Sequence, residues 1–380
     1  PIASDLTANS DNVDAGGGDD TITAGLVQNP GGTDRVNSLQ DEDVIDGGDG
    51  TDTLDVTLGN ANDNGDTIIT PTITNVETLK LTFSGLGQNA VNELDLQNST
   101  GFNALEISDV SLDGTATVDN IQDVLSTVSV SNSGEDTDNL SLSFDDDVLN
   151  GDADVLGLTV DDVDVNNFEV DGEDAEGYET INVTAAGDFE VDFFAIDEWQ
   201  TLDFAGAGDV TIGDFAFDGN GDGVDDDADA GDQIDLSRGH FAKFDASDAT
   251  GDYDVDLGAA NVIGAQNADG SGTDIDFDYD GSQGADTIRV DEASLASGPT
   301  AGDDDNGHDS IDGGAGADTL DFTVNAGAAA VDLVQADVTV SNIETVRIDA
   351  VDASAGNAID LDASLIGGLE TVIVRNNDDN

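Results

Sequence analysis

The nonapeptide GGDGTDTLD at residues 47–55 combines the residue types that hold a hard cation. Gly47, Gly48 and Gly50 permit a tight turn that residues with a β-carbon would strain. Such a turn directs backbone carbonyl oxygens and the carboxylate of Asp52 toward one point, and oxygen ligands of this kind suit Ca²⁺. The spacing therefore predicts a calcium-binding turn, with a short strand directly after it.

A second complete match to the same pattern, GGAGADTLD, stands at residues 313–321. Its ligand positions are Gly313, Gly314, Gly316 and Asp318. Leu54 and Leu320 occupy the apolar position that should point into a core. The two nonapeptides resemble the haemolysin-type calcium-binding repeat (RTX) family. That resemblance implies a parallel β-roll with calcium between stacked turns.

Degenerate nonapeptides flank the complete ones in frame, and they add candidate ligands. These candidates are Gly18, Asp20, Asp34, Asp43, Asp286 and Asp309. In the RTX β-roll a calcium ion lies between turns that are two nonapeptides apart. The resemblance therefore places Asp34 and Asp52 at one site and Asp43 at another.

A separate acidic loop, DGNGDGVDDDAD, occupies residues 218–229. Its oxygen donors fall at positions 1, 3, 5, 7, 9 and 12, the spacing that wraps one Ca²⁺, with a glycine at position 6 for the sharp turn. The candidate ligands are Asp218, Asn220, Asp222, Val224 through its carbonyl, Asp226 and Asp229. The loop resembles the short Asp-rich loops of thrombospondin type 3 repeats or dockerins. A solvated acidic loop is the alternative.

Strands with alternating apolar residues follow each nonapeptide region, and their spacing repeats. NVETLKL contains Glu77, and NIETVRI contains Glu344, 267 residues later. The first glycines of the two complete nonapeptides, Gly47 and Gly313, are 266 residues apart. These matching offsets indicate an internal duplication. A third, degenerate copy includes LNGDADVLG at residues 149–157 and the Glu179 of GYETINV.

Three copies of a unit too small to bury its own apolar face predict an all-β fold, a parallel β-roll or β-solenoid with calcium-binding turns. Five ranges are expected. They are residues 1–56 (RTX-like nonapeptides), 57–148 (solenoid unit 1), 149–204 (unit 2), 205–303 (an insertion with the acidic loop) and 304–380 (RTX-like repeats and unit 3).

Charge is the dominant feature of the composition, with 86 Asp and Glu against 7 Lys and Arg and a net charge of −79. Repulsion of this size opposes a compact fold unless counter-ions neutralise it. Ca²⁺ is therefore the expected cofactor, and a surface adapted to high salt is the alternative. A chain without a basic patch excludes nucleic acid as a partner.

The composition also bears on where the protein works. No cysteine is present, so no disulfide can stabilise the fold. No apolar run approaches the length of a membrane span. No signal peptide precedes Pro1, which leaves a mature chain, a fragment and export by a C-terminal signal as alternatives.

Catalytic motifs are missing from the sequence. The two histidines, His240 and His308, belong to no H-E-x-x-H motif, and there is neither a G-x-S-x-G elbow nor a phosphate loop with lysine. Paired carboxylates carry no information in a chain with so many acids. We therefore expect no enzymatic activity.

The combination of N-[IV]-E-T-[LV]-x-[IL] strands with RTX nonapeptides resembles the calcium-dependent surface-layer proteins of Gram-negative bacteria. The resemblance implies a secreted or cell-surface structural protein, a surface-layer or filament subunit that is folded and cross-linked by calcium. Its expected partners are copies of itself, with cell-surface polysaccharide as a further candidate. The first alternative is a calcium-stabilised segment of a secreted RTX adhesin. The second is a secreted enzyme whose site is not recognisable.

Overall fold

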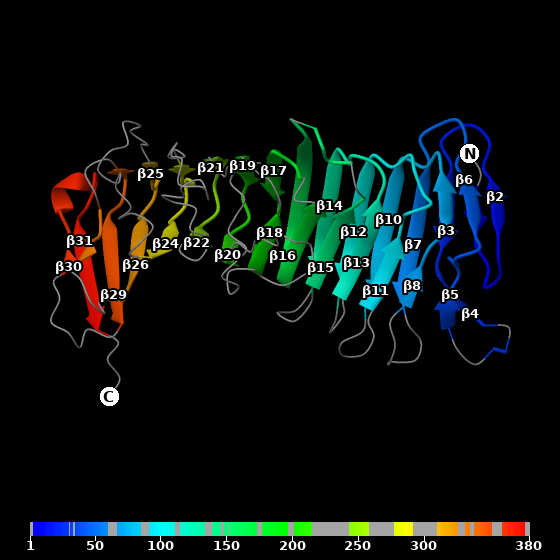
Figure 1. Cartoon of the computed structure of the whole chain (residues 1–380), viewed down its shortest axis with the longest axis horizontal. Helices are drawn as coiled ribbons and strands as arrows, with labels where there is room; N and C mark the ends of the chain where they lie inside the picture. Colours follow the sequence, from blue (N-terminus) through cyan, green and yellow to red (C-terminus); the bar gives the residue numbers. More distant parts are fainter. Residues whose placement is uncertain are drawn as a thin grey trace.

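The computed structural model describes residues 3–29, 31–32, 35–59, 67–84, 91–110, 115–133, 139–145, 148–151, 153–172, 177–196, 201–214, 243–257, 277–291, 310–325, 331–334, 338–351 and 359–376. In these ranges the elements are β-strands and one 3₁₀ turn, η3 (Ala363–Leu365). Figure 1 shows the strands stacked side by side along the long axis of the molecule, from the N-terminal to the C-terminal end.

A first ladder of parallel strands runs the length of the stack. Its members are β1 (Ala3–Asp5), β3 (Thr21–Ala24), β7 (Thr53–Gly59), β10 (Thr78–Ser84), β12 (Ala104–Val110), β14 (Thr127–Ser133), the first half of β16 (Val155–Gly172), β17 (Thr180–Ala185), β19 (Thr201–Gly206), β21 (Lys243–Ala249), β23 (Asp278–Asp280), β25 (Ser310–Asp312) and β28 (Thr339–Ser341). Each strand between the first and the last pairs with the equivalent strand of the coil before and the coil after.

A second ladder is formed by the strands that follow these along the chain. Its members are β8 (Thr67–Ile69), β11 (Val91–Asp95), β13 (Thr115–Ile121), β15 (Asn139–Phe144), the second half of β16, β18 (Phe189–Ile196), β20 (Val210–Asp214), β22 (Tyr253–Asp256), β24 (Thr287–Asp291), β26 (Thr319–Asn325), β29 (Thr345–Val351) and β31 (Thr371–Asn376). The long strand β16 belongs to both ladders and joins them into one sheet.

A third side closes the coil between the end of a second-ladder strand and the start of the next first-ladder strand. Near the N-terminus it consists of β2 (Asn12–Asp14), β6 (Val44–Asp46) and β9 (Thr72–Thr74). Near the C-terminus the short strands β27 (Val331–Asp332) and β30 (Ile359–Asp360) take this place.

The core consists of columns of apolar side chains that face inward at alternate strand positions. Ile22, Leu54, Leu79 and Leu105 stand in register on four successive strands, and each is at most 2 % exposed. Burying a side chain of this size stabilises the fold by about 1.5–3 kcal/mol. The alternation in the sequence is therefore what stacks one coil on the next.

Aromatic side chains fill part of the core in the C-terminal half. The rings of Phe204, Phe244 and Tyr279 form a stack along the first ladder, with 4.9 Å between neighbouring centroids. Stacked aromatic pairs add about 0.5–1.5 kcal/mol beyond their buried area. These rings therefore strengthen the contact between successive coils.

The predicted all-β parallel solenoid is confirmed, but its coils are longer than two nonapeptides. Thr21 pairs with Thr53, and Thr53 pairs with Thr78. The chain on either side of the candidate ligand Asp34 departs from the parallel pattern, because β4 (Leu26–Gln28) and β5 (Arg35–Asn37) pair antiparallel as a side hairpin. All the other strand pairings among the described residues are parallel. Whether the five predicted ranges fold as units stays a prediction.

No helix in the described ranges has the length and apolar character needed to cross a membrane.

Candidate cation-binding turns

The two complete nonapeptides adopt the same backbone. The second glycines, Gly48 and Gly314, have φ angles of 94° and 85°. The third glycines, Gly50 and Gly316, have φ angles of 157° and 155°. Left-handed values such as those of the second glycines strain any residue with a β-carbon. The glycines that the motif specifies therefore set the path of the turn.

Each of these turns stacks directly on a turn of the preceding coil. In the first, the Gly18 N–H donates to the Asp49 carbonyl oxygen at 2.6 Å, and the Asp49 N–H donates to the Gly16 carbonyl oxygen at 2.8 Å. A β-carbon at Gly48 would overlap the Gly16 carbonyl oxygen, and one at Gly50 would overlap that of Gly18. The glycines thus also allow close contact between coils.

The motif aspartate links three successive coils at the N-terminal site. The Asp20 N–H donates to Asp52 Oδ1 at 2.7 Å, and the Asp52 N–H donates to Glu77 Oε2 at 2.7 Å. Asp20 and Asp52 are at most 2 % exposed. A carboxylate that accepts a backbone N–H from the neighbouring coil therefore sits at each step of this short column.

The same column recurs at the C-terminal site, and part of it recurs in the middle copy. The Asp286 N–H donates to Asp318 Oδ1 at 2.8 Å, and the Asp318 N–H donates to Glu344 Oε2 at 2.9 Å. In the middle copy the Asp154 N–H donates to Glu179 Oε2 at 2.5 Å. The repeat read from the sequence is thus also a repeat of one hydrogen bond.

The second carboxylate oxygen of the motif aspartates is buried and has no hydrogen-bond partner. This holds for Oδ2 of Asp52, whose residue is 0 % exposed, and for Oδ2 of Asp318, whose residue is 1 % exposed. The Asp154 Oδ2 atom is in the same state. A buried, unpartnered carboxylate oxygen is costly unless a proton or a cation joins it. Consistent with this, burial raises the pKa of Asp318 to about 6, with the charges of Asp286 and Glu344 adding to the shift.

Two other candidate aspartates are already satisfied by the protein. Asp43 accepts the N–H of Asp11 at 2.7 Å and that of Gln40 at 2.8 Å. Asp286 accepts from the Ser282 N–H and the Ser282 hydroxyl, both at 2.7 Å. Burial raises the pKa of both carboxyl groups. Asp52 and Asp318 are therefore better placed than these two to accept an added ion.

The donor set at Asp52 and Asp318 fits a hard divalent cation, because it consists of carboxylate and carbonyl oxygens. In the described part of the chain no three His, Cys, Asp or Glu side chains gather as a metal cluster. A Ca²⁺ ion would therefore be held by one motif carboxylate together with backbone carbonyls of the stacked turns. The charge of the ion would neutralise the buried carboxylate.

Several candidate ligands lie outside the described residues. They are Asp34, Asp309 and the acidic-loop residues Asp218, Asn220, Asp222, Val224, Asp226 and Asp229. Among the described residues the turn that stacks against the Asp52 turn is that of Asp20. The pairing of Asp34 with Asp52 that the RTX resemblance implies stays a prediction.

A column of glycine–aspartate turns between the two ladders was not foreseen. A β-carbon at Gly208 would overlap the Gly187 carbonyl oxygen, and one at Gly251 would overlap that of Gly208. The Asp252 N–H donates to Asp209 Oδ1 at 2.9 Å. The signal was present in the sequence as the repeated segments GDFEV, GDVTI and GDYDV, which begin at residues 187, 208 and 251.

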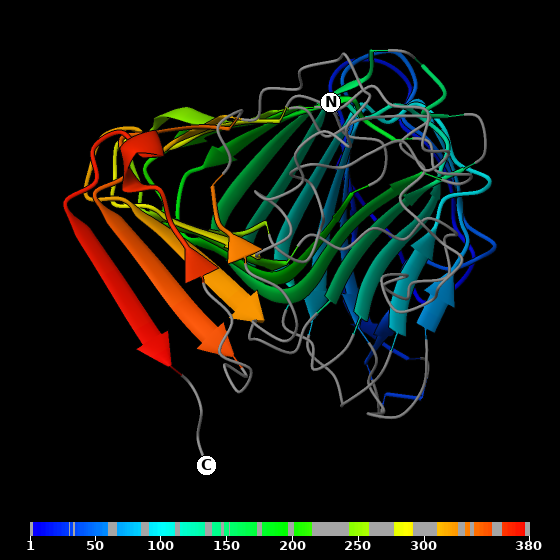
Figure 2. The same cartoon turned by 60° about the vertical axis from the view of Figure 1, so that its left-hand side comes forward.

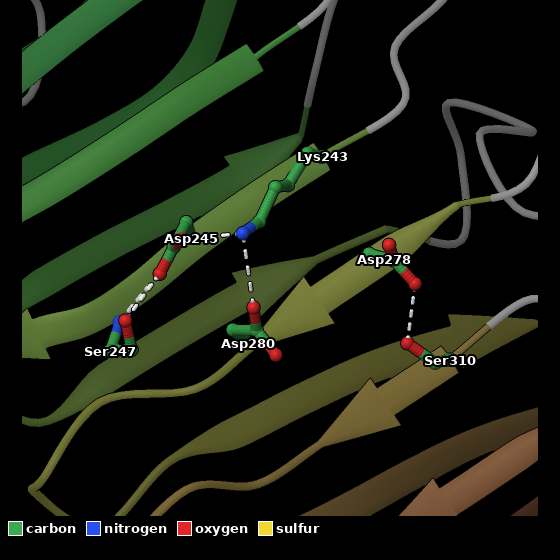
Figure 3. A network of polar contacts seen from close by, with 6 residues as sticks. All are labelled: Lys243, Asp245, Ser247, Asp278, Asp280 and Ser310. Carbon is green, nitrogen blue, oxygen red and sulfur yellow. Dashed lines mark hydrogen bonds and ion pairs between the residues drawn. The ribbon is translucent and has the colours of Figure 1, made fainter.

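The outer surface of the first ladder carries carboxylates in register around Lys243. Figure 3 shows Lys243 Nζ between Asp245 Oδ2, at 2.6 Å, and Asp280 Oδ2, at 3.3 Å. Asp203 stands beside Asp245 on the preceding strand, and burial together with the Asp245 charge raises its pKa. The lysine relieves only part of the repulsion at this place.

Comparison with known proteins identifies no relative: no family model matches the chain, and no curated protein or solved structure matches it either.

Proposed function

We propose that this chain is a structural, self-assembling extracellular protein, a surface-layer or filament subunit whose coils are held together by Ca²⁺. The observation that carries the proposal is the pair of buried, unpartnered oxygens, Asp52 Oδ2 and Asp318 Oδ2, inside stacked glycine turns. A chain with a net charge of −79 needs cations to stay compact, and these turns offer oxygens to hold them.

The architecture supports a structural role. Most of the described strands belong to one continuous parallel sheet, which offers a long regular surface for contacts between copies. Because the ladder contacts are local, ions bound at a few turns stabilise coils directly and their neighbours indirectly.

The first test is the effect of calcium on folding and assembly. Extracellular calcium modules bind with dissociation constants of about 10⁻⁴–10⁻³ M. A site at 100 times its dissociation constant adds about 2.7 kcal/mol to stability. We expect the β signal in circular dichroism and the light scattering to rise on adding Ca²⁺ and to fall with chelator.

Each outcome of this test has a definite meaning. A spectrum that chelator leaves unchanged at low salt would overturn calcium-dependent folding. Recovery of the spectrum in NaCl alone would favour adaptation to high salt, because screening then replaces specific binding. A calcium-folded but monodisperse monomer would overturn self-assembly and favour the adhesin segment.

A matched pair of variants separates ion binding from general charge reduction. Asp52→Asn removes the buried carboxylate, whereas Asp55→Asn removes an exposed one three residues later in the same motif. Both change the net charge equally. Calcium titration by calorimetry should show lower stoichiometry for Asp52→Asn and the wild-type value for Asp55→Asn. The same stoichiometry in both would show that Asp52 holds no ion.

A further inference from the structure

The last strand of the second ladder leaves core positions uncovered. Val372 and Val374 on β31 are 46 % and 66 % exposed. They continue inward-facing columns whose preceding members are buried, namely Leu320 and Val346 in one and Phe322 and Ile348 in the other. In Figure 2 β31 is the outermost strand of this end, in red. A further coil in the same register would bury both valines.

The sequence duplication gives both ends of the solenoid related cross-sections. The first nonapeptide turn connects β6 on the third side to β7 on the first ladder. Its copy connects β25 on the first ladder to β26 on the second. Each strand of the second sequence repeat therefore lies one side further around the coil than its equivalent in the first repeat.

This shift determines which surfaces of two copies match. By the 267-residue offset of the duplication, β31 (from Thr371) is the copy of β12 (from Ala104). The strand β12 belongs to the ladder of β7 and β10, which begins with β1 and β3 at the N-terminal end. If β1 of a second protein chain pairs with β31 of the first, then β2 and β6 of the second chain lie on the side of the coil that β25 and β28 of the first chain form.

The C-terminal end carries basic side chains that the N-terminal end lacks. Residues 3–29 carry five aspartates and no lysine or arginine. The last two strands of the second ladder carry Arg347 and Arg375, and Arg375 stands in register with Asp349. Arg347 is paired with Asp321, and residues 359–376 also carry Asp360, Asp362 and Glu370. Arg375 on the exposed strand is therefore a local partner for an aspartate of a second copy, at an end that is acidic as a whole.

We propose that the N-terminal coils of a second copy of this chain dock on β31, with β1 as the next parallel strand and with each copy rotated by one side of the coil relative to the last. This inference rests on the proposed self-assembly and specifies its interface. The contact is heterologous, so it produces a filament with a screw axis instead of a closed dimer.

The absence of cysteine permits a direct test by cross-linking. With Ser4 beside Val372, Asp5 lies beside Ile373 on the outer face. Neighbouring strands are about 4.8 Å apart, which a disulfide can span. One protein carries Asp5→Cys and the other Ile373→Cys. Mixed in Ca²⁺ under mild oxidation, they should give a cross-linked dimer, and chelator should abolish it.

A second pair serves as the control for rotation. Asp14→Cys places the thiol on β2, which lies on the third side, so it should not react with Ile373→Cys. A cross-link from the Asp14→Cys protein in place of one from the Asp5→Cys protein would overturn the one-side rotation. Assembly by light scattering without the cross-link between Asp5→Cys and Ile373→Cys would overturn this interface and leave the proposed function standing. Absence of any assembly would overturn both.

A variant of the apolar patch supplies an independent readout. Val374→Asp places a charge where the second copy should bury a methyl group, at a position that faces solvent in the isolated subunit. Assembly should fall at least about tenfold, the equivalent of about 1.4 kcal/mol, while the circular dichroism spectrum in Ca²⁺ stays unchanged. Unchanged assembly would place the interface elsewhere.

Discussion

The Glu77 carboxylate accepts a hydrogen bond from the Asp52 backbone N–H at 2.7 Å, across the step from one coil to the next. The same contact joins Asp318 to Glu344 and Asp154 to Glu179. The glutamate of the N-[IV]-E-T and Y-E-T segments therefore has a structural role in all three copies, because it satisfies the backbone donor of the motif aspartate.

Replacing Glu77 tests that role. Glu77→Ala leaves the Asp52 N–H without its acceptor, and a buried donor left unpaired costs about 1–3 kcal/mol. We expect the urea midpoint in Ca²⁺ to fall accordingly. The control is Glu190→Ala, which removes an exposed glutamate on β18 and should change stability by less than about 0.5 kcal/mol. Equal falls of the urea midpoint in the two variants would show that the Glu77 carboxylate does not stabilise the fold through the Asp52 N–H.

Gly208 tests close stacking away from the nonapeptides. Gly208→Ala sets a β-carbon against the Gly187 carbonyl oxygen, so the two coils must move apart. A cost of about 1–3 kcal/mol is expected in thermal unfolding. Gly25→Ala is the matched control, since a β-carbon there meets nothing within 4 Å. Tolerance of alanine at Gly208 would show that the turns are not in tight contact.

The carboxylates of the second ladder predict a pH dependence. Burial raises the pKa of Glu93 above its ordinary value of 4.5, and the charges of Asp119 and Asp95 raise it further. The folded state therefore binds the Glu93 proton more tightly than the unfolded chain. Its contribution to the free energy of unfolding falls as the pH rises through the folded pKa.

The variant Glu93→Gln should therefore be more stable than the wild type at about pH 8, and its advantage should shrink toward about pH 5. Melting temperatures in chelator at the two pH values measure the difference. If the variant gains the same melting temperature over the wild type at both pH values, Glu93 has the same pKa in the folded and unfolded states.

Lys243 predicts a salt dependence. Lys243→Gln leaves Asp245 and Asp280 without their cation, next to Asp203. Because these groups are partly exposed, the loss should be about 1 kcal/mol or less at physiological salt. It should grow at about 0.01 M ionic strength and vanish near about 1 M, because the screening length falls as salt is added. A loss that is constant with salt would mean that packing, not charge, is responsible.

The duplication was readable from the sequence because both copies keep the same backbone-determining residues. Asn75 and Asn342, 267 residues apart, have φ angles of 53° and 52°, and each donates to an aspartate of the preceding coil, Asp46 or Asp312. The apolar alternation that the sequence shows after each nonapeptide region is likewise an alternation of burial, as at Leu79 and Val346. Local chemistry fixes these features, so a pattern can reveal them.

The stacking partners could not be read in the same way. Asp20 meets Asp52 because the β4–β5 hairpin takes the intervening residues out of the coil. A motif specifies how a turn is shaped but not how many residues separate it from the turn it contacts. The glycine–aspartate column was missed for a related reason, since each GD segment is too short to stand out in a chain so rich in both residues.

The ladder arrangement also has a mechanical consequence. The hydrogen bonds between described strands run along the long axis of the solenoid, and each coil is bonded only to its neighbours. Tension along that axis therefore loads one inter-coil step after another, instead of shearing many bonds at once. Pulled from its ends, such a chain should yield coil by coil and lengthen in small increments.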